Sequence, residues 1–75
     1  MKMTIYERIR NLRESLDPPM SQAELGRNLH KTQRAISRLE TGESHLQDSD
    51  IIAYCNFFRV SADYILGLTD DWDRK

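Results

Sequence analysis

The sequence has few residues that interrupt helices and no apolar run long enough to cross a membrane. Its 75 residues include three glycines and two prolines, and no stretch alternates polar and apolar residues as a half-buried strand does. No apolar run approaches the ~20 residues that a spanning helix needs. The first four residues lack the apolar core of a signal peptide. We therefore expect an all-α domain in the cytoplasm, with no membrane partner.

Cysteine and histidine are also scarce. The single cysteine, Cys55, excludes an internal disulfide and favours a reducing compartment. His30 and His45 are well separated along the chain and do not form a cluster with metal-ligand spacing. The sequence contains no nucleophile–base pair and no phosphate-binding loop. We expect no metal, no cofactor and no enzymatic activity.

The net charge of −1 conceals an uneven distribution of charge. Residues 26–39 contain four basic side chains and no acidic one, so the rest of the chain carries −5. Acidic residues gather late in the chain, at Asp63, Asp70, Asp71 and Asp73. Because DNA responds to the local field rather than to the total charge, the basic middle segment is the candidate nucleic-acid surface.

Apolar spacing and capping residues predict five helices. Ile5, Ile9, Leu12 and Leu16 recur at helical spacing, and Asp17-Pro18-Pro19 ends this first helix. The helices are expected over about 4–16, from a cap at Ser21 to about 29, from a cap at Thr32 to a stop at Gly42, over about 48–58, and from a cap at Ser61 to a stop at Gly67.

Two finer features follow from the same reasoning. Ser21-Gln-Ala-Glu24 has the pattern of a capping box, in which Ser21 accepts from a backbone amide and Glu24 reaches back to the cap. The inner face of the fourth helix is predicted to consist of Ile51, Ile52, Cys55 and Phe58.

The gap between the second and third helices is very short, so these helices must cross steeply. In that arrangement one helix lies over the DNA backbone while the other enters the major groove. The third helix has Ile36 and Leu39 on one side and polar residues on the other: Gln33, Arg34, Ser37 and Arg38. Glutamine suits adenine edges and arginine suits guanine edges. An ordinary solvated helix face is the alternative.

The order and spacing of several segments resemble the lambda-repressor-like (XRE or Cro-like) helix-turn-helix family. These segments are Arg8-Ile-Arg10-Asn-Leu-Arg13, Ser21-Gln-Ala-Glu-Leu-Gly26, Leu29, Ile36-Ser-Arg-Leu-Glu-Thr-Gly42 and Val60-Ser-Ala-Asp-Tyr-Ile-Leu-Gly67. The resemblance covers about residues 4–67. It implies a compact five-helix DNA-binding domain over 1–67, with 68–75 as an acidic tail that we expect to be frayed.

The resemblance also implies roles for matched residues. The recognition helix, about 32–41, would contact bases through Gln33, Arg34, Ser37 and Arg38. Phosphates would be contacted by Gln22, Arg27, Lys31, Thr32, Thr41 and His45, with Gln22 also bracing the recognition helix. Arg13 and Glu40 match a pair that forms an internal salt bridge in many relatives.

The chain departs from the family pattern at the turn and in the following loop. Relatives usually have alanine at Gly26, glycine at His30 and an apolar residue at Lys31. Relatives often have bases where this chain has Glu43 and Asp48. Because positive φ is uncommon at a residue other than glycine, although histidine is enriched among the exceptions, we expect either a turn that bends differently or a Lys31 that reaches a phosphate. We also expect weaker phosphate contact from the loop.

These features together predict a sequence-specific transcriptional regulator that binds double-stranded DNA. Repression is the default because a lone domain blocks polymerase by occupancy, and the operator is expected to be a palindrome bound by a dimer. An apolar surface at Phe57, joined by Ile65 or Leu68, favours a homodimer through the C-terminal part. Alternatively, Trp72 and its neighbours fold back over the core. The alternative function is an antitoxin or protein-interaction module with a protein partner.

Overall fold

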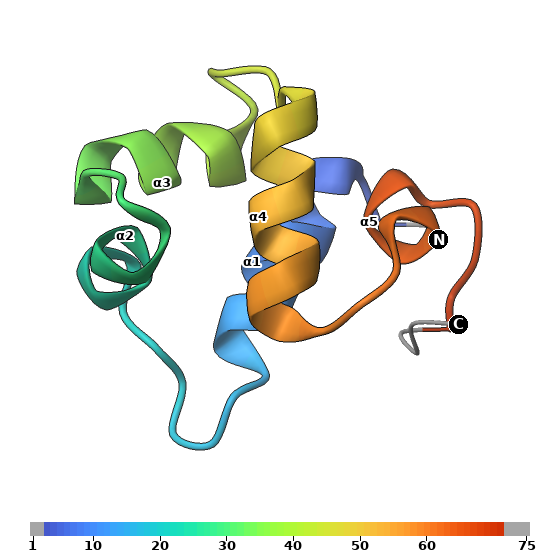
Figure 1. Cartoon of the computed structure of the whole chain (residues 1–75), viewed down its shortest axis with the longest axis horizontal. Coiled ribbons are helices and arrows are strands. Elements are labelled where there is room, and N and C mark those ends of the chain that lie inside the picture. The colour runs from blue at the N-terminus through green and yellow to red at the C-terminus, as the bar shows by residue number, and fades with distance from the viewer. Residues whose placement is uncertain (1–2, 72–75) are drawn as a thin grey trace.

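The computed structural model describes residues 3–71, and these residues form five helices. The helices are α1 (Ile5–Glu14), α2 (Gln22–Leu29), α3 (Gln33–Thr41), α4 (Asp48–Phe58) and α5 (Ala62–Leu66). In Figure 1, α4 crosses the centre in front of α1, with α2 and α3 on one side and α5 on the other. The predicted all-α, five-helix architecture is confirmed. None of the helices within 3–71 has the length and apolar character needed to span a membrane.

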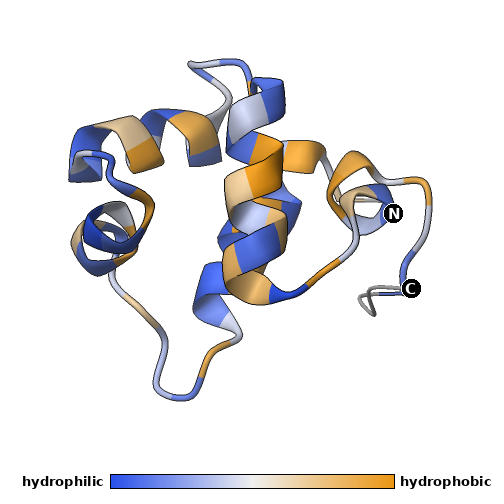
Figure 2. Ribbon diagram, in the orientation of Figure 1, coloured by the Kyte–Doolittle hydropathy of each residue, from blue (hydrophilic) through white to orange (hydrophobic). Residues whose placement is uncertain are grey.

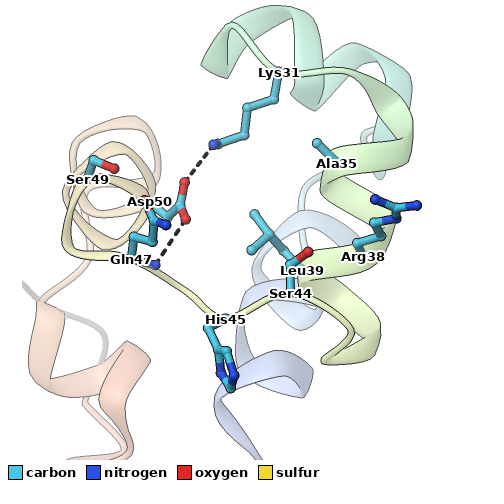
Figure 3. A pocket seen from close by; sticks show the side chains of 9 residues that line it. All are labelled: Lys31, Ala35, Arg38, Leu39, Ser44, His45, Gln47, Ser49 and Asp50. Carbon is cyan, nitrogen blue, oxygen red and sulfur yellow. Dashed lines mark hydrogen bonds and ion pairs between the residues drawn. The ribbon is translucent and has the colours of Figure 1, made fainter.

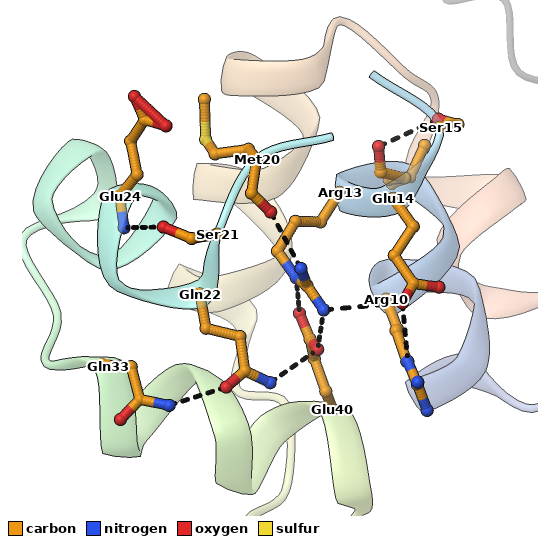
Figure 4. A network of polar contacts seen from close by, with 11 residues as sticks. Arg10, Arg13, Glu14, Ser15, Met20, Ser21, Gln22, Glu24, Gln33 and Glu40 are labelled. Atoms are coloured by element: carbon orange, nitrogen blue, oxygen red, sulfur yellow. Dashed lines mark hydrogen bonds and ion pairs between the residues drawn. The ribbon is translucent and has the colours of Figure 1, made fainter. Parts of the chain in front are cut away.

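Side chains cap most of the helix starts, as the sequence predicts. The hydroxyls of Thr4, Ser21, Thr32 and Ser61 each accept a hydrogen bond from the backbone amide three residues later. The full two-way capping box forms at Thr4 and Glu7. At Ser21 only the serine half forms, because the Glu24 side chain points away from the cap (Figure 4). The prediction for Glu24 was therefore wrong.

The first helix is shorter than the apolar pattern predicts. It ends at Glu14, and Leu16 lies beyond it in the loop. The hydroxyl of Ser15 donates to the Leu12 carbonyl, 2.9 Å away, and the Ser15 amide donates to Asn11. A serine side chain that bonds to the preceding turn competes with the helical backbone pattern, and the helix ends here before the prolines are reached.

The core lies between α4 and the helices around it. Its buried apolar residues are Ile9, Leu12, Leu25, Ile36, Leu39, Tyr54, Cys55, Val60, Tyr64 and Ile65. The predicted inner face of α4 is wrong at one position, since Ile52 is 59% exposed and Tyr54 is fully buried. Residues 51, 54, 55 and 58 form a continuous helical stripe, whereas Ile52 lies about 100° round the helix. Figure 2 shows that apolar and hydrophilic residues alternate along the helices, as they do in helices with one buried face.

The C-terminal segment is attached to α1 by a buried arginine. Arg8 donates from Nη1 to the carbonyls of Tyr64 (3.0 Å) and Thr69 (3.2 Å), and from Nη2 to Asp70 Oδ1 (2.9 Å). Its guanidinium lies 4.8 Å from the centre of the Tyr64 ring. Residues 69 and 70 are thus held in place, contrary to the expectation of a frayed tail. Trp72 lies outside the described residues.

Candidate nucleic-acid interface

In the turn between α2 and α3, the residue with the left-handed backbone conformation is His30 and not a glycine. His30 adopts φ 59° and ψ 40°, the left-handed conformation that favours glycine and is uncommon for other residues. The Lys31 amide then donates to the Gly26 carbonyl at 2.7 Å. A Cβ at position 26 would lie 2.6 Å from the Lys31 carbonyl oxygen, closer than real Cβ contacts allow. Gly26 therefore provides the space in which this turn folds against α2.

The four candidate base-contacting residues lie on α3, opposite its buried face. Gln33, Arg34 and Arg38 are exposed and Ser37 is half-buried. On the other side, Ile36 and Leu39 are buried in the core. The helix thus has one apolar and one polar face, and the polar face has donors and acceptors of the kinds that read base edges.

A buried ion pair fixes α3 against α1 (Figure 4). Arg13 Nε donates to Glu40 Oε2 at 2.8 Å, and Arg13 Nη2 donates to Glu40 Oε1 at 3.0 Å. Arg13 also donates to the Met20 carbonyl at 2.8 Å, which ties the loop before α2 to the same group. The hydrogen bond to Glu40 raises the pKa of Arg13 despite the opposing effect of burial. The pair that the resemblance implies is present, in two-pronged geometry.

Gln22 and Gln33 continue this network to the surface. Gln22 Nε2 donates to Glu40 Oε1 at 3.0 Å, and Gln33 Nε2 donates to Gln22 Oε1 at 2.7 Å. Because a carboxylate only accepts, it orients the Gln22 amide, and Gln22 in turn orients the Gln33 amide. Gln33 retains its carbonyl oxygen and one N–H for other partners. That is the donor–acceptor pair that an adenine edge requires.

On the other side of α3, Arg38 and His45 line a pocket of about 300 Å³ beside the start of α4 (Figure 3). Lys31 crosses its edge and contacts Asp50, with 2.6 Å between Lys31 Nζ and Asp50 Oδ1. The other oxygen, Asp50 Oδ2, accepts from the Gln47 amide at 3.0 Å. Lys31, which the sequence suggested as a phosphate contact, is therefore paired with α4 in this structure.

The environment of Asp50 favours its charged form. Burial alone would raise the pKa of this carboxyl, but the hydrogen bonds from Lys31 and from the Gln47 amide, with the charge of Lys31, lower it below the ordinary value. Both carboxylate oxygens of Asp50 therefore have a hydrogen-bonding partner.

The other candidate phosphate-contacting residues are distributed over α2, α3 and the loop that follows. Arg27, Thr32, Thr41 and His45 are exposed, whereas Gln22 is half-buried within the network described above. The hydroxyl of Thr32 caps α3, and that of Thr41 donates to the Arg38 carbonyl at 3.3 Å. Glu43 Oε2, in the loop, lies 3.9 Å from Arg38 Nε and partly offsets the positive charge of Arg38 on α3.

The sequence analysis did not predict the roles of two residues, Asp50 and Arg8. Asp50 has the spacing of a capping residue relative to Gln47, but no local pattern relates it to Lys31, nineteen positions earlier. The sequence pattern gives no sign that Arg8 differs from the exposed basic residues of an amphipathic helix, yet only 2% of its side chain is exposed. The partners of both are set by the fold.

Comparison with known proteins gave one family and a set of similar structures. A family model described as Helix-turn-helix matches residues 9–65. A crystal structure of the P22 c2 repressor protein in complex with synthetic operator 9T is 31% identical, with a TM-score of 0.75, covering 87% of this chain and 96% of that one. An NMR structure of the DNA-binding domain of the P22 c2 repressor is 28% identical, with a TM-score of 0.77, covering 100% and 93% respectively. A search of curated proteins found no match.

Proposed function

The chain belongs to the helix-turn-helix family of lambda-repressor-like domains, and on this premise we propose that it represses transcription by binding a palindromic operator as a dimer. The family consists of DNA-binding transcriptional regulators, which are not enzymes. The observation that carries the proposal is the polar face of α3, which is exposed and yet anchored to the core. Gln33 belongs to both parts, because it lies at the surface and is bonded through Gln22 to Glu40.

In this proposal α3 lies in the major groove and contacts bases through Gln33, Arg34, Ser37 and Arg38. The restricted amide of Gln33 suits adenine, and the two exposed arginines suit guanine. Such base contacts give sequence preference, whereas contacts to phosphates set the position of the protein on the duplex.

Phosphate contacts are proposed for Gln22, Arg27, Thr32, Thr41 and His45. Lys31 is omitted because its ammonium group is paired with Asp50. Affinity should fall steeply with salt, since each neutralised phosphate releases counterions.

A dimer is proposed through the C-terminal part of the chain. Large apolar side chains remain exposed there, at Phe57 (36%), Leu66 (41%) and Leu68 (75%). Ile65, which the sequence suggested for this surface, is fully buried and takes no part. In a two-fold dimer the recognition helices would lie about 34 Å apart, one turn of DNA.

Selection of bound sites from random duplex DNA tests the proposal directly. A palindrome with half-sites about one helical turn apart is expected. Enrichment of no sequence, with no binding at low salt, would reject the proposal.

The base contacts are tested by Arg38→Ala. We expect relaxed preference at one base position and a loss of about 1–3 kcal/mol in operator binding. Arg59→Asn is the matched control, since it removes an exposed arginine at the far end of α4, and asparagine tolerates the positive φ of that position. The assignment fails if both variants bind alike.

The exposed apolar residues also support a second candidate, an antitoxin or protein-interaction module on the same fold. This candidate predicts a chain that ignores DNA at low salt and binds a protein through residues 54–75. The same site-selection experiment separates it from a repressor. A reducing, cytoplasmic location belongs to both proposals, as does the division into a domain over 1–67 and a short tail.

A further inference from the structure

We propose that Asp50 holds Lys31 away from the DNA backbone and thereby lowers the affinity of the protein for duplex DNA of any sequence. This inference rests on the proposed DNA-binding function. Asp50 itself does not contact DNA in this proposal; it is a positioning residue that acts by holding Lys31.

The ion pair lies beside the proposed DNA surface. Lys31 directly precedes Thr32, the cap of the recognition helix, and it lines the same pocket as Arg38 and His45 (Figure 3). Those two residues are proposed to contact a base and a phosphate. A lysine at this position, on a flexible four-carbon stem, is within reach of the same backbone once it is released.

The pairing is strong enough to hold Lys31. The two charged atoms are 2.6 Å apart, and the side chains of Lys31 and Asp50 are only 27% and 9% exposed. Screening by solvent is therefore weaker than for a surface pair. Because the Gln47 amide fixes the other carboxylate oxygen, Asp50 cannot turn away with the lysine.

The consequence is a missing counterion contact. Each phosphate that a protein neutralises steepens the dependence of log affinity on log salt by about 0.9. A paired Lys31 contributes no such contact, so its release should add one. Between 50 and 200 mM salt, that extra contact makes the loss of affinity about 3.5-fold larger.

Binding to a short duplex of random sequence, measured across this salt range, tests the inference. Asp50→Asn keeps an oxygen for the Gln47 amide but releases Lys31, and we expect tighter binding at low salt and a slope steeper by about 0.9. Asp48→Asn is the matched control. It removes the same charge from the same helix end, where, within residues 3–71, Asp48 Oδ1 accepts from the adjacent Ser49 amide and not from a cation, and we expect its slope to equal that of the unchanged protein.

Removing both charges distinguishes the possible causes. If release of Lys31 is the cause, K31M/D50N returns to the slope of the unchanged protein. A double variant as steep as D50N would overturn the inference, because Asp50 would then act by repulsion alone. A double variant flatter than the unchanged protein by about 0.9 would also overturn it, because Lys31 would already contact a phosphate.

Two further points keep the test decisive. If D50N does not fold, as judged by circular dichroism, K31M/D50L replaces the pair by apolar side chains, an exchange that buried ion pairs often tolerate. An unchanged slope supports the inference and a flatter one overturns it. If the unchanged protein binds no duplex at low salt, the proposed function fails together with this inference. If it binds and D50N is no steeper, only this inference fails.

Discussion

Two arginines point from α1 into the protein, and their surroundings differ sharply. Arg13 meets a carboxylate, that of Glu40, whose side chain is 2% exposed. Arg8 is itself 2% exposed, but its carboxylate partner, Asp70, is 89% exposed, and its other hydrogen bonds go to backbone carbonyls. One arginine thus anchors α3 through a buried charge, and the other anchors α5 and residues 69–70 largely through neutral groups.

Burial of the acidic partner determines whether an ion pair has a structural role. At Arg13 the carboxylate is withdrawn from water and bonded a third time, by Gln22, so that the network extends to the recognition helix. At Arg8 the carboxylate remains in solvent, and water can replace it. We therefore expect the stability of the α1–α3 junction to depend on its acidic residue, Glu40. The stability of the α1–α5 junction should depend instead on its basic residue, Arg8.

The largest effect is expected for Glu40→Ala. It leaves Arg13 buried without its counter-charge, and we expect a loss of about 3–5 kcal/mol in unfolding free energy, measured by urea denaturation. Glu14→Ala is the control, because that carboxylate is half exposed, pairs with the exposed Arg10 at 3.2 Å and makes only a long contact with Arg13, at 3.9 Å. Equal losses in the two variants would contradict the distinction between the junctions.

The second effect is expected for Arg8→Met. This change removes three hydrogen bonds and the contact with the Tyr64 ring, while the methionine side chain refills part of the apolar volume. We expect a loss of about 1–3 kcal/mol on urea denaturation. Arg10→Met, at an exposed position of the same helix, should cost under about 1 kcal/mol. If Arg8 is no more costly than Arg10, α5 is not anchored in this way.

A change of opposite sign is expected for Tyr54→Phe, on the α4 side of the Arg13–Glu40 pair. The hydroxyl of Tyr54 is buried and has no hydrogen-bond partner among residues 3–71. Burial, with the charges of Glu40 and Asp50, raises the pKa of this phenol. Removal of the hydroxyl should stabilise the protein by up to about 1 kcal/mol, seen as a higher melting temperature. Tyr6→Phe, at a half-buried position, is the comparison, and a lower melting temperature for Tyr54→Phe would refute the expectation.

The smallest effect is expected for Asp70→Asn. Its carboxylate is exposed, so we expect a loss below about 1 kcal/mol that disappears at high salt. Denaturation at low and high salt measures both quantities. A loss as large as that of Arg8→Met would mean that the α1–α5 junction depends on its acid after all.

Local patterns were sufficient to predict the helices and the polar face of α3. Hydroxyl caps and glycine stops depend on neighbouring residues, which is why Thr32, Ser61, Gly42 and Gly67 mark helix ends as expected. The Arg13–Glu40 pair was identified through a family motif, and two-pronged contact between these residues is present. The base and phosphate contacts remain predictions, because they depend on a partner.

Contacts between distant elements could not be predicted from local patterns. Which of Ile52 and Tyr54 is buried depends on the rotation of α4 against the core, and a difference of two positions reverses the answer. The Lys31–Asp50 and Arg8–Asp70 pairs each join segments far apart in the sequence. No spacing rule relates such residues, and only the packing of the helices brings them together.

The close approach at Gly26 limits how this scaffold can be re-engineered. A donor α2 carrying alanine at position 26 would place its methyl group against the Lys31 carbonyl, unless the donor's own turn came with it. A donor turn with glycine at position 30 could likewise follow a different path over α2. The end of α2 and the turn that follows it should therefore be exchanged together. A graft that alters DNA specificity should contain residues 26–32 as one unbroken segment, with its junctions before residue 26 and after residue 32.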